Sequence, residues 1–375
     1  MKRMFGPIWF FALALAVFSA LPPVFGWFSE IGQRWAWLLL FSALVSFVFV
    51  PPAGWLSVRL GILDIPGGRK DHEGPTPLLG GLAVYLSFIA ALFINGIITP
   101  VLITVISAST IILSVGILED WFGVREWIRL LAQAAAFIMV ATAGVQLSLF
   151  APTPIGQALN LFLSFLWIVG ITNAMNFIDG IDGLCAGISM TIAFFLGVIA
   201  FLTYQPELGW LSATLLGATL GFFPYNFIPR RKALIFLGDA GSSFLGFLLA
   251  CLALIGEWSD NAPLVSFSTP LLIFGVLIYD MIYTNVSRIV TGKVRGTREL
   301  LAFVGRDHIH HRMETILGAR SLAVAFLVLV NIILGLSAVA LRNVDFFVAI
   351  TLVIQAVVVF ILITIIEIRY MERKK

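Results

Sequence analysis

Charged residues and cysteines are scarce in this sequence. Only 11% of its 375 residues are Asp, Glu, Lys or Arg, whereas a soluble domain carries about 25%. The two cysteines, Cys185 and Cys251, lie in or beside apolar segments and form no metal-binding spacing, so we assign neither a disulfide nor a cysteine metal site. The net charge is only +3, and we expect no nucleic-acid partner. This composition excludes an ordinary soluble domain.

Apolar residues dominate instead. They make up 60% of the chain, and the mean hydropathy is +1.04. In lipid only helices and closed barrels satisfy every backbone polar group, and long uninterrupted apolar runs exclude the alternating pattern of a barrel. We therefore predict an all-α polytopic membrane protein, one integral domain over residues 1–375, with about 11–12 transmembrane helices. The expected spans are 7–26, 35–54, 79–96, 98–118, 127–147, 157–175, 184–203, 209–226, 236–255, 265–287, 320–341 and 345–367.

The basic residues predict the orientation of these spans. With twelve crossings, all of the 23 Lys and Arg residues except Arg34 and Arg342 lie on one side, which the positive-inside rule places in the cytoplasm. Both termini are expected on that side. The polar segments of the chain also lie there, which predicts one shared cytoplasmic surface. They are 64–77, 119–129, 173–183, 230–243 and 292–312.

One short polar stretch separates two long apolar runs at residues 173–184. Asn173, Asn176, Asp179 and Asp182 recur at a spacing of three, so a continued helix would carry the first three on one face. Hydrocarbon disfavours such groups unless a partner compensates them. Clustered oxygen ligands at a helix end favour a hard cation, above all magnesium, and a substrate that carries phosphate. The alternative is a polar loop that caps two helices.

A pair of adjacent acids, Glu119 and Asp120, ends the fourth expected span. Adjacent carboxylates repel, so at least one of them needs a cation, a proton or water. The structural alternative is a pair of charges at the membrane interface. Arg129 follows at the start of the fifth span, where it either reaches the lipid headgroups or holds an anionic headgroup as substrate.

Asp239 stands between Gly238 and Gly241 at the expected start of the ninth span. Glycines allow a ligand to approach the backbone closely, and a helix N-terminus offers free backbone donors. Asp239 is therefore either a metal ligand or an ordinary N-cap residue. We favour the metal ligand because the carboxylates of Asp179 and Asp182 are expected on the same face.

The first cytoplasmic loop combines prolines and glycines with Arg69, Lys70 and His72. The turn-forming residues predict a shaped loop, and the cationic side chains are suited to phosphate oxygens. A solvated, positively charged loop is the alternative reading of this segment.

Three of the four histidines lie together in the last long loop, as His308, His310 and His311, and Arg312 follows them. Zinc is conceivable, but no cysteine accompanies them. We favour imidazoles and guanidiniums that hydrogen-bond a diphosphate. Upstream, Asp280 is expected near the cytoplasmic end of the tenth span, where a charge is usually paired or functional.

Together these loops resemble the polyprenyl-phosphate N-acetylhexosamine-phosphate transferase family, also called glycosyltransferase family 4. The resemblance covers residues 60–315. It depends on four ordered motifs, which are Glu119-Asp120, Asn173 to Leu184, Phe236 to Ser242 and His308 to His311. The His-Ile-His-His order is similar to the subgroup that moves N-acetylglucosamine phosphate onto undecaprenyl phosphate. The branch that transfers phospho-muramoyl-pentapeptide typically has three consecutive histidines.

The resemblance implies an enzyme of the bacterial cytoplasmic membrane, with its active site facing the cytoplasm. A UDP-sugar and undecaprenyl phosphate would react to give UMP and a lipid-linked sugar, the step that starts O-antigen, lipopolysaccharide or teichoic acid synthesis in cell wall biogenesis. Mg²⁺ is the implied cofactor, with Mn²⁺ as a substitute; membrane lipids and a homodimer are further expected partners. The alternatives are another UDP-N-acetylhexosamine, UDP-muramoyl-pentapeptide or, more distantly, a transporter of an anionic solute.

The resemblance also implies roles for individual residues. Those expected in catalysis are Asp120, Glu119, Asp179, Asp239 and His308, with Asp120 acting on the lipid phosphate as base or orienter. Magnesium would be held by Asp239 and Asn176 with Asp179 close by, and the lipid phosphate by Arg129 and Asn173. The nucleotide and diphosphate would be bound by Asp182, Phe236, His308, His310, His311, Arg312 and Lys70.

Three features depart from the family pattern. Glu119 replaces the first Asp of an Asp-Asp pair, which lengthens that side chain. Leu277 stands where many relatives have proline before the intramembrane acid. Two spans rather than one precede the first loop, which places the N-terminus inside.

Overall fold

The computed structural model describes residues 5–65, 74–229, 231–258, 263–294, 296, 299, 305, 307–341 and 344–373. The predicted phosphate-binding residue Lys70 lies outside this part of the chain, as do Arg69 and His72. The helices are α1 (Pro7–Ser19), α2 (Pro22–Glu30), α3 (Arg34–Leu60), α4 (Gly80–Asn95), α5 (Pro100–Phe122), α6 (Glu126–Thr142), α7 (Pro154–Ile178), α8 (Leu184–Leu202), α9 (Pro206–Asn226), α10 (Gly238–Ile255), α11 (Pro263–Ile273), α12 (Gly275–Val290), α14 (Ile309–Leu317), α15 (Arg320–Ala340) and α16 (Phe346–Arg373).

Every expected span coincides with a helix or with a bent pair of helices, which confirms a polytopic helical membrane protein. Seven described helices are long and apolar enough to cross a membrane, or up to nine if each bent pair is one span. The bent pairs are α1 with α2, at 68°, and α11 with α12, at 76°. Among the others, α4 is apolar but shorter. The test by length and composition therefore supports fewer crossings than the 11–12 expected.

Proline and threonine side chains define several helix starts. Pro100 and Pro154 occupy the first turns of α5 and α7, where a missing backbone N–H costs no hydrogen bond. Just before them, the hydroxyl oxygens of Thr99 and Thr153 accept hydrogen bonds from backbone N–H groups at 3.2 and 3.1 Å. These N-caps fix where two long helices begin, and hence where their far ends lie.

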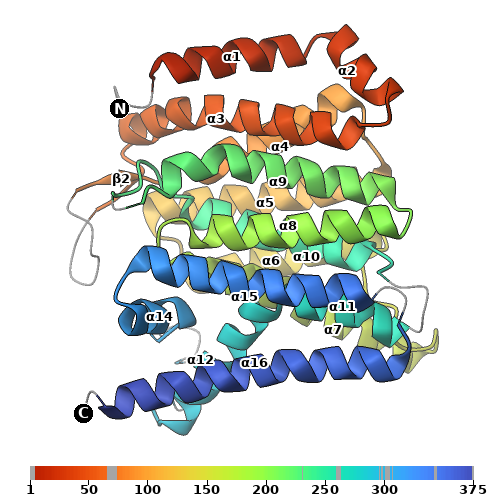
Figure 1. Cartoon of the computed structure of the whole chain (residues 1–375), viewed down its shortest axis with the longest axis vertical. Coiled ribbons are helices and arrows are strands. Elements are labelled where there is room, and N and C mark those ends of the chain that lie inside the picture. Colours follow the sequence, from red (N-terminus) through yellow and green to blue (C-terminus); the bar gives the residue numbers. More distant parts are fainter. Residues whose placement is uncertain are drawn as a thin grey trace.

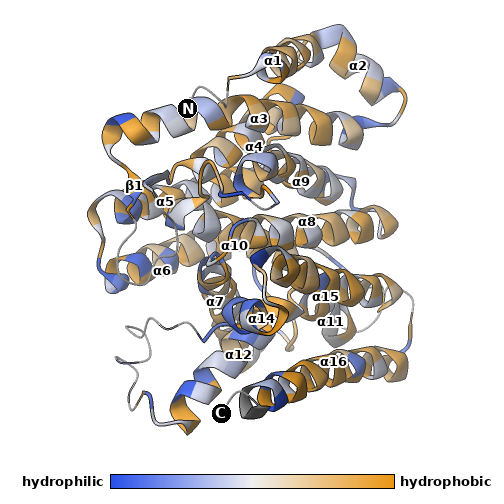
Figure 2. Cartoon of the chain, turned by 60° about the vertical axis from the view of Figure 1, so that its left-hand side comes forward, coloured by the Kyte–Doolittle hydropathy of each residue, from blue (hydrophilic) through white to orange (hydrophobic). Residues whose placement is uncertain are grey.

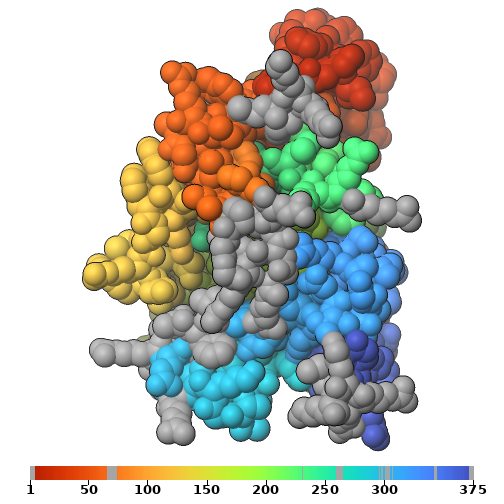
Figure 3. All heavy atoms as spheres, turned by 90° about the vertical axis from the view of Figure 1, so that its left-hand side faces the viewer, coloured from red at the N-terminus to blue at the C-terminus, as the bar shows by residue number. Residues whose placement is uncertain are grey.

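Most of the long helices lie side by side along one common axis, with both chain termini at the same end of the bundle (Figure 1). The same end carries α14 and the two short antiparallel strands β1 (Leu63–Asp64) and β2 (Thr76–Pro77). Hydrophilic colour gathers there, on α14 and at the ends of α6 and α12 (Figure 2). Viewed from this side, segments of nearly every sequence colour reach one face (Figure 3). We call this the polar end.

Among the seven long apolar helices, α10 is the most enclosed, with 89% of its 18-residue apolar stretch buried inside the protein. Small residues at its start allow its neighbours to approach closely. A Cβ atom on Gly81 of α4 would lie 2.2 Å from the Cα of Gly241, and one on Gly116 of α5 would lie 2.4 Å from the Cα of Ala240. The first turn of α10 is therefore wedged between α4 and α5, at the polar end.

Candidate functional site

The chain enters α10 through a segment that is held by backbone hydrogen bonds. Phe236 donates its N–H to the Pro77 carbonyl at 2.8 Å, and its own carbonyl accepts from Gly80 at 3.1 Å. Gly238 then turns with a φ of +77°, where a Cβ atom would lie 2.4 Å from the Leu78 carbonyl oxygen. Glycine is required here on both counts. This turn places Asp239 in the first turn of α10.

The two adjacent acids at the end of α5 have different partners. Glu119 forms an ion pair with Arg129 of α6, with 2.8 Å between Oε1 and Nη1. Asp120 points to α10 instead, where its two carboxylate oxygens accept the backbone N–H groups of Asp239 and Ala240 at 3.0 and 3.2 Å. A carboxylate from another helix thus caps α10 and stabilises the free donors of its first turn. The sequence predicted that at least one of these two acids needs a cation, a proton or water, and Arg129 is the cation beside Glu119.

Asp239 does not act as an N-cap, because its side chain turns to α7. Asn176 donates through Nδ2 to Asp239 Oδ1 at 2.7 Å and to Ser242 Oγ at 3.1 Å. The helix α7 continues to Ile178, so Asn173 and Asn176 lie within it, as a continued helix requires. The Nδ2 and Oδ1 atoms of an amide are assigned from the hydrogen bonds around them. A cation beside Asp239 would therefore be faced by the amide oxygen after a flip of the Asn176 side chain.

Asp179 follows as the residue that ends α7. Burial raises the pKa of this carboxyl well above its usual range, and the nearby carboxylates of Asp239, Asp120 and Asp182 raise it further. Asp120, Asn176, Asp179 and Asp239 form what we call the acidic cluster. Its three carboxylates come from α5, α7 and α10, and they repel one another in a partly buried setting.

The other polar residues of the 173–184 stretch bind protein groups. Asn173 donates through Nδ2 to Gln133 Oε1 of α6 at 2.8 Å. Asp182 Oδ2 accepts the backbone N–H of Ala233 at 3.2 Å, which attaches the turn before α8 to the segment that leads into α10. The sequence did not indicate Gln133, whose side chain is buried within an apolar helix. In this structure Asn173 and Asp182 hold the frame around the acidic cluster.

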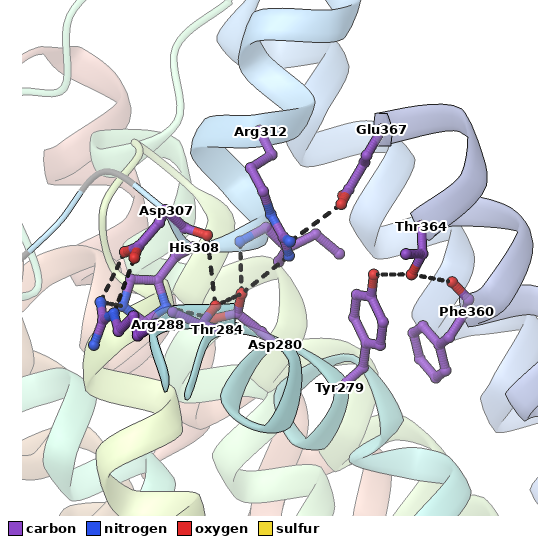
Figure 4. Close-up of polar contacts among 11 residues, drawn as sticks. Tyr279, Asp280, Thr284, Arg288, Asp307, His308, Arg312, Phe360, Thr364 and Glu367 are labelled. Carbon is purple, nitrogen blue, oxygen red and sulfur yellow. Dashed lines mark hydrogen bonds and ion pairs between the residues drawn. The ribbon is translucent and has the colours of Figure 1, made fainter. Parts of the chain in front are cut away.

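Asp280 of α12 is the centre of the second group of side chains (Figure 4). His308 Nδ1 lies 2.7 Å from Asp280 Oδ2, and the backbone N–H of Ile309 donates to Asp280 Oδ1 at 2.6 Å. Arg288 binds Asp307 through two hydrogen bonds of 2.9 and 2.7 Å. Burial alone would raise the pKa of Asp307, but the Arg288 guanidinium holds that pKa below its usual range.

We call Asp280, Arg288, Asp307, His308 and Arg312 the histidine network. The sequence identified Asp280 and His308 but not Arg288 or Asp307, because a single cation at the end of a span carries no distinctive pattern. Arg312, predicted to bind a diphosphate, lies between protein carboxylates in this structure. Its Nη1 is 3.1 Å from Glu367 Oε2, and its Nη2 is 3.7 Å from Asp280 Oδ1.

His310 connects the histidine network to the acidic cluster. Its side chain is buried, and its Nε2 atom lies where a Cβ atom of Gly180 would be, at 2.1 Å. Neither ring nitrogen has a hydrogen-bond partner among the described residues. Burial, together with nearby His311, lowers the pKa of His310 to about 3. The ring is therefore neutral at physiological pH. Its Nε2 atom lies against Gly180, the residue that follows Asp179.

The donor set fits a hard divalent cation. Asp239, Asn176 and Asp179 offer only carboxylate and amide oxygens, which Mg²⁺ prefers, whereas zinc prefers nitrogen and sulfur. The negative charges of Asp239 and Asp179 repel each other, and a cation would remove that repulsion. Within the described ranges, however, no three His, Cys, Asp or Glu side chains are already arranged around a single metal position.

Comparison with known proteins gives a consistent set of relatives. Residues 102–257 match the family described as glycosyl transferase family 4. The chain is 31% identical to the probable undecaprenyl-phosphate N-acetylglucosaminyl 1-phosphate transferase of Bacillus subtilis, over 87% of this chain and 88% of the relative. It is 30% identical to the decaprenyl-phosphate N-acetylglucosaminephosphotransferase of Mycobacterium tuberculosis, over 73% and 74% of the two chains. It is 29% identical to the undecaprenyl-phosphate alpha-N-acetylglucosaminyl 1-phosphate transferase of Yersinia pestis, over 73% and 75%.

Proposed function

This chain belongs to glycosyl transferase family 4, and from that premise we propose that it transfers N-acetylglucosamine phosphate from a UDP-sugar to undecaprenyl phosphate. The products are UMP and undecaprenyl-diphospho-N-acetylglucosamine. This is a first membrane step of cell-envelope polysaccharide synthesis. The relatives in three bacteria support the sugar, and the two with undecaprenyl in their names support the acceptor.

The convergence of carboxylates from α5, α7 and α10 carries this proposal. Asn176 contacts Asp239 at 2.7 Å, and Asp239 in turn donates its backbone N–H to Asp120. An excess of negative charge cannot by itself attract a diphosphate. The cluster would suit that substrate by holding a divalent ion, which would supply charge neutralisation for the diphosphate.

In the proposed reaction, an oxygen of the lipid phosphate attacks the β-phosphorus of the UDP-sugar. The new P–O bond forms as the bond from the β-phosphorus to the bridging oxygen breaks, and UMP leaves with that oxygen. Bound magnesium would supply charge neutralisation on the diphosphate, held by Asp239 and Asn176 with Asp179 beside them. Positioning and electrostatics supply most of the acceleration in such transfers.

The geometry favours Asp120 as an orienting residue rather than a base. Both of its oxygens already accept backbone N–H groups of α10. The lipid phosphate has a second pKa of about 6 and is mostly deprotonated at neutral pH, so little proton abstraction is needed. Asp120 would thus fix the position of Asp239, while His310 would offer neutral ring nitrogens beside Gly180.

The lipid phosphate would approach from the α6 side of the cluster. Arg129 of α6 lies beside the acids of α5, with its Nη1 at 2.8 Å from Glu119 Oε1. Asn173 lies one turn before Asn176 and bonds Gln133 of the same neighbouring helix. The positive-inside distribution of Lys and Arg supports a cytoplasmic location for this end of the bundle, on the side where UDP-sugars would be available.

A panel of UDP-sugars tests the proposal. Purified full-length protein would be incubated with undecaprenyl phosphate, Mg²⁺ and one donor at a time, and UMP release would be measured. We expect release with UDP-N-acetylglucosamine, and weaker release or none with UDP-muramoyl-pentapeptide and other UDP-N-acetylhexosamines. Release with a different donor alone would correct the sugar. No release with any donor, with uptake of an anionic solute into proteoliposomes, would favour a transporter.

A further inference from the structure

A charged side chain of the last helix is buried against the histidine network. From Phe346 to Ile366 the helix α16 carries no charged residue. Only 17% of its 18-residue apolar stretch is buried in the protein. Glu367 is the first charged residue of α16, and unlike most of that helix its side chain is buried, at only 4% exposed. It points inward toward Arg312 (Figure 4). A buried carboxylate on a helix that otherwise faces lipid is usually paired or functional.

The guanidinium of Arg312 is held from three sides. Glu367 Oε2 lies 3.1 Å from Nη1, Asp280 Oδ1 lies 3.7 Å from Nη2, and the ring of Tyr283 is stacked 4.0 Å from the guanidinium carbon. Two carboxylates therefore share one cation. Glu367 is the closer of the two, so it keeps Arg312 from moving fully onto Asp280.

The position of Arg312 matters because Asp280 also holds His308. Asp280 Oδ2 lies 2.7 Å from His308 Nδ1, and Asp280 Oδ1 accepts the backbone N–H of Ile309 at the start of α14. An Arg312 released from Glu367 would compete with His308 for Asp280. A displacement there would change the direction of α14, which carries His310 against Gly180.

We propose that Glu367 is a positioning residue for the transfer reaction, acting through Arg312 and Asp280 on the histidines of α14. This inference rests on the proposed function for its kinetic consequence. It reaches beyond the 102–257 range that matches the family, and it assigns to α16 a role other than crossing the membrane.

The α16 helix has a second, uncharged attachment that supplies a matched control. The ring of Phe360 stacks on Tyr279 with 4.5 Å between centroids, and Tyr279 Oη lies 2.7 Å from Thr364 Oγ1. Phe360→Ala weakens the docking of α16 on α12 but leaves Glu367 and Arg312 in place. Any effect of Glu367→Gln that Phe360→Ala reproduces is therefore due to docking alone.

The first test is kinetic. For Glu367→Gln we expect kcat/KM for the UDP-sugar, per folded protein, to fall about tenfold, with the KM for undecaprenyl phosphate unchanged. Glu367→Asp should recover part of the loss, and Phe360→Ala should lower thermal stability but leave kcat/KM near that of the wild type. Wild-type kinetics in Glu367→Gln would overturn the proposal, as would equal losses in Glu367→Gln and Phe360→Ala.

The second test needs no turnover, so it separates this proposal from the assigned reaction. Cys185 and Cys251 are buried, so a spin label on Thr315→Cys would report on α14. Glu367→Gln should increase the motion of that label, and Phe360→Ala should leave it nearly unchanged. An unchanged label in Glu367→Gln would refute the positioning role. A changed label in a protein whose wild type releases no UMP would refute the reaction and keep the positioning role.

Discussion

The acidic cluster and the histidine network meet at the contact of His310 with Gly180, but their charges are balanced differently. In the histidine network each carboxylate has a cation or an imidazole nearby, as Asp307 has Arg288 and Asp280 has His308. In the acidic cluster Asp120 is bonded to backbone N–H groups, and Asp239 contacts a neutral amide. The charges of the histidine network are balanced within the protein, whereas the acidic cluster gathers negative charge that a cation would balance.

This contrast explains how the two groups are built. The acidic cluster depends on close backbone contacts, with Gly81 against Gly241 and Gly116 against Ala240. The histidine network depends on long side chains that span from α12 to α14 and α16. We infer that the first group places the metal and the reacting phosphates, and that the second fixes the direction of α14. The predictions below break or sharpen this division, from the largest expected effect to the smallest.

Asp239→Asn should have the largest effect. The substitution removes one negative charge from the acidic cluster but keeps a side chain of the same shape beside Asn176. We expect turnover to fall by about 10³-fold, with nearly the same yield of folded protein. UMP release and size-exclusion profiles measure the two quantities. Retained turnover would remove the metal-binding role from Asp239.

Asp120→Asn should reduce the rate by about 10²-fold. The amide would keep one acceptor for the N–H groups of Asp239 and Ala240 but turn a donor toward the other, which shifts the first turn of α10. Because the proposed role of Asp120 is to position Asp239 rather than to bind the nucleotide, the affinity for UDP-N-acetylglucosamine should change much less than kcat. Equal losses in kcat and in nucleotide affinity would indicate a structural role only.

Gly180→Ala should lower kcat about tenfold. The new Cβ atom would lie 2.1 Å from His310 Nε2, so the ring must move. Gly26→Ala is the matched control, because no atom lies within 4 Å of the Cβ position of Gly26. The kinetics of both variants, measured side by side, test whether His310 belongs to the site. Wild-type kinetics in Gly180→Ala would show that the contact is unimportant.

The smallest effect concerns the pH dependence of stability. The pKa of His310 is about 3 in the folded protein and about 6.5 in the unfolded chain. Below about pH 6.5 the unfolded chain takes up a proton that the folded protein does not. Stability from this group is therefore complete above that pH and declines as the pH falls, by at most about 1.4 kcal/mol per pH unit.

Thermal unfolding of the wild type and of His310→Gln, between pH 7.5 and 5.5, measures this contribution. We expect the melting temperature of the wild type to fall more steeply toward low pH than that of the variant. Parallel slopes for the two proteins would show that His310 is not held neutral by its burial.

Much of the fold followed from composition and spacing. Apolar runs predicted a helix for every expected span. The helix continuation under which Asn173 and Asn176 would share one face is present in α7, which runs to Ile178. The bends between α1 and α2 and between α11 and α12 were not predicted, because an apolar run does not reveal a change of helix direction.

The convergence of Asp120, Asn176 and Asp239 was also predicted, because polar groups at the ends of apolar spans must share one membrane surface. The partners were not. The bonds of Asp120 to the backbone of α10 depend on a close approach of α5 to α10. In the sequence, Gly116 is the one glycine of α5 and so the only residue there that indicates this approach. Glu367 ended the last expected span without any motif around it, so nothing in the sequence indicated that it faces Arg312.

The most direct test of this account is the binding of Mn²⁺ in place of Mg²⁺. Electron paramagnetic resonance would count the ions held by the purified wild type, by Asp239→Asn and by Asp307→Asn in the presence of UDP-N-acetylglucosamine. The account predicts one bound ion per chain in the wild type and in Asp307→Asn, and none in Asp239→Asn. Equal binding by Asp239→Asn and the wild type would contradict the claim that the acidic cluster holds the metal.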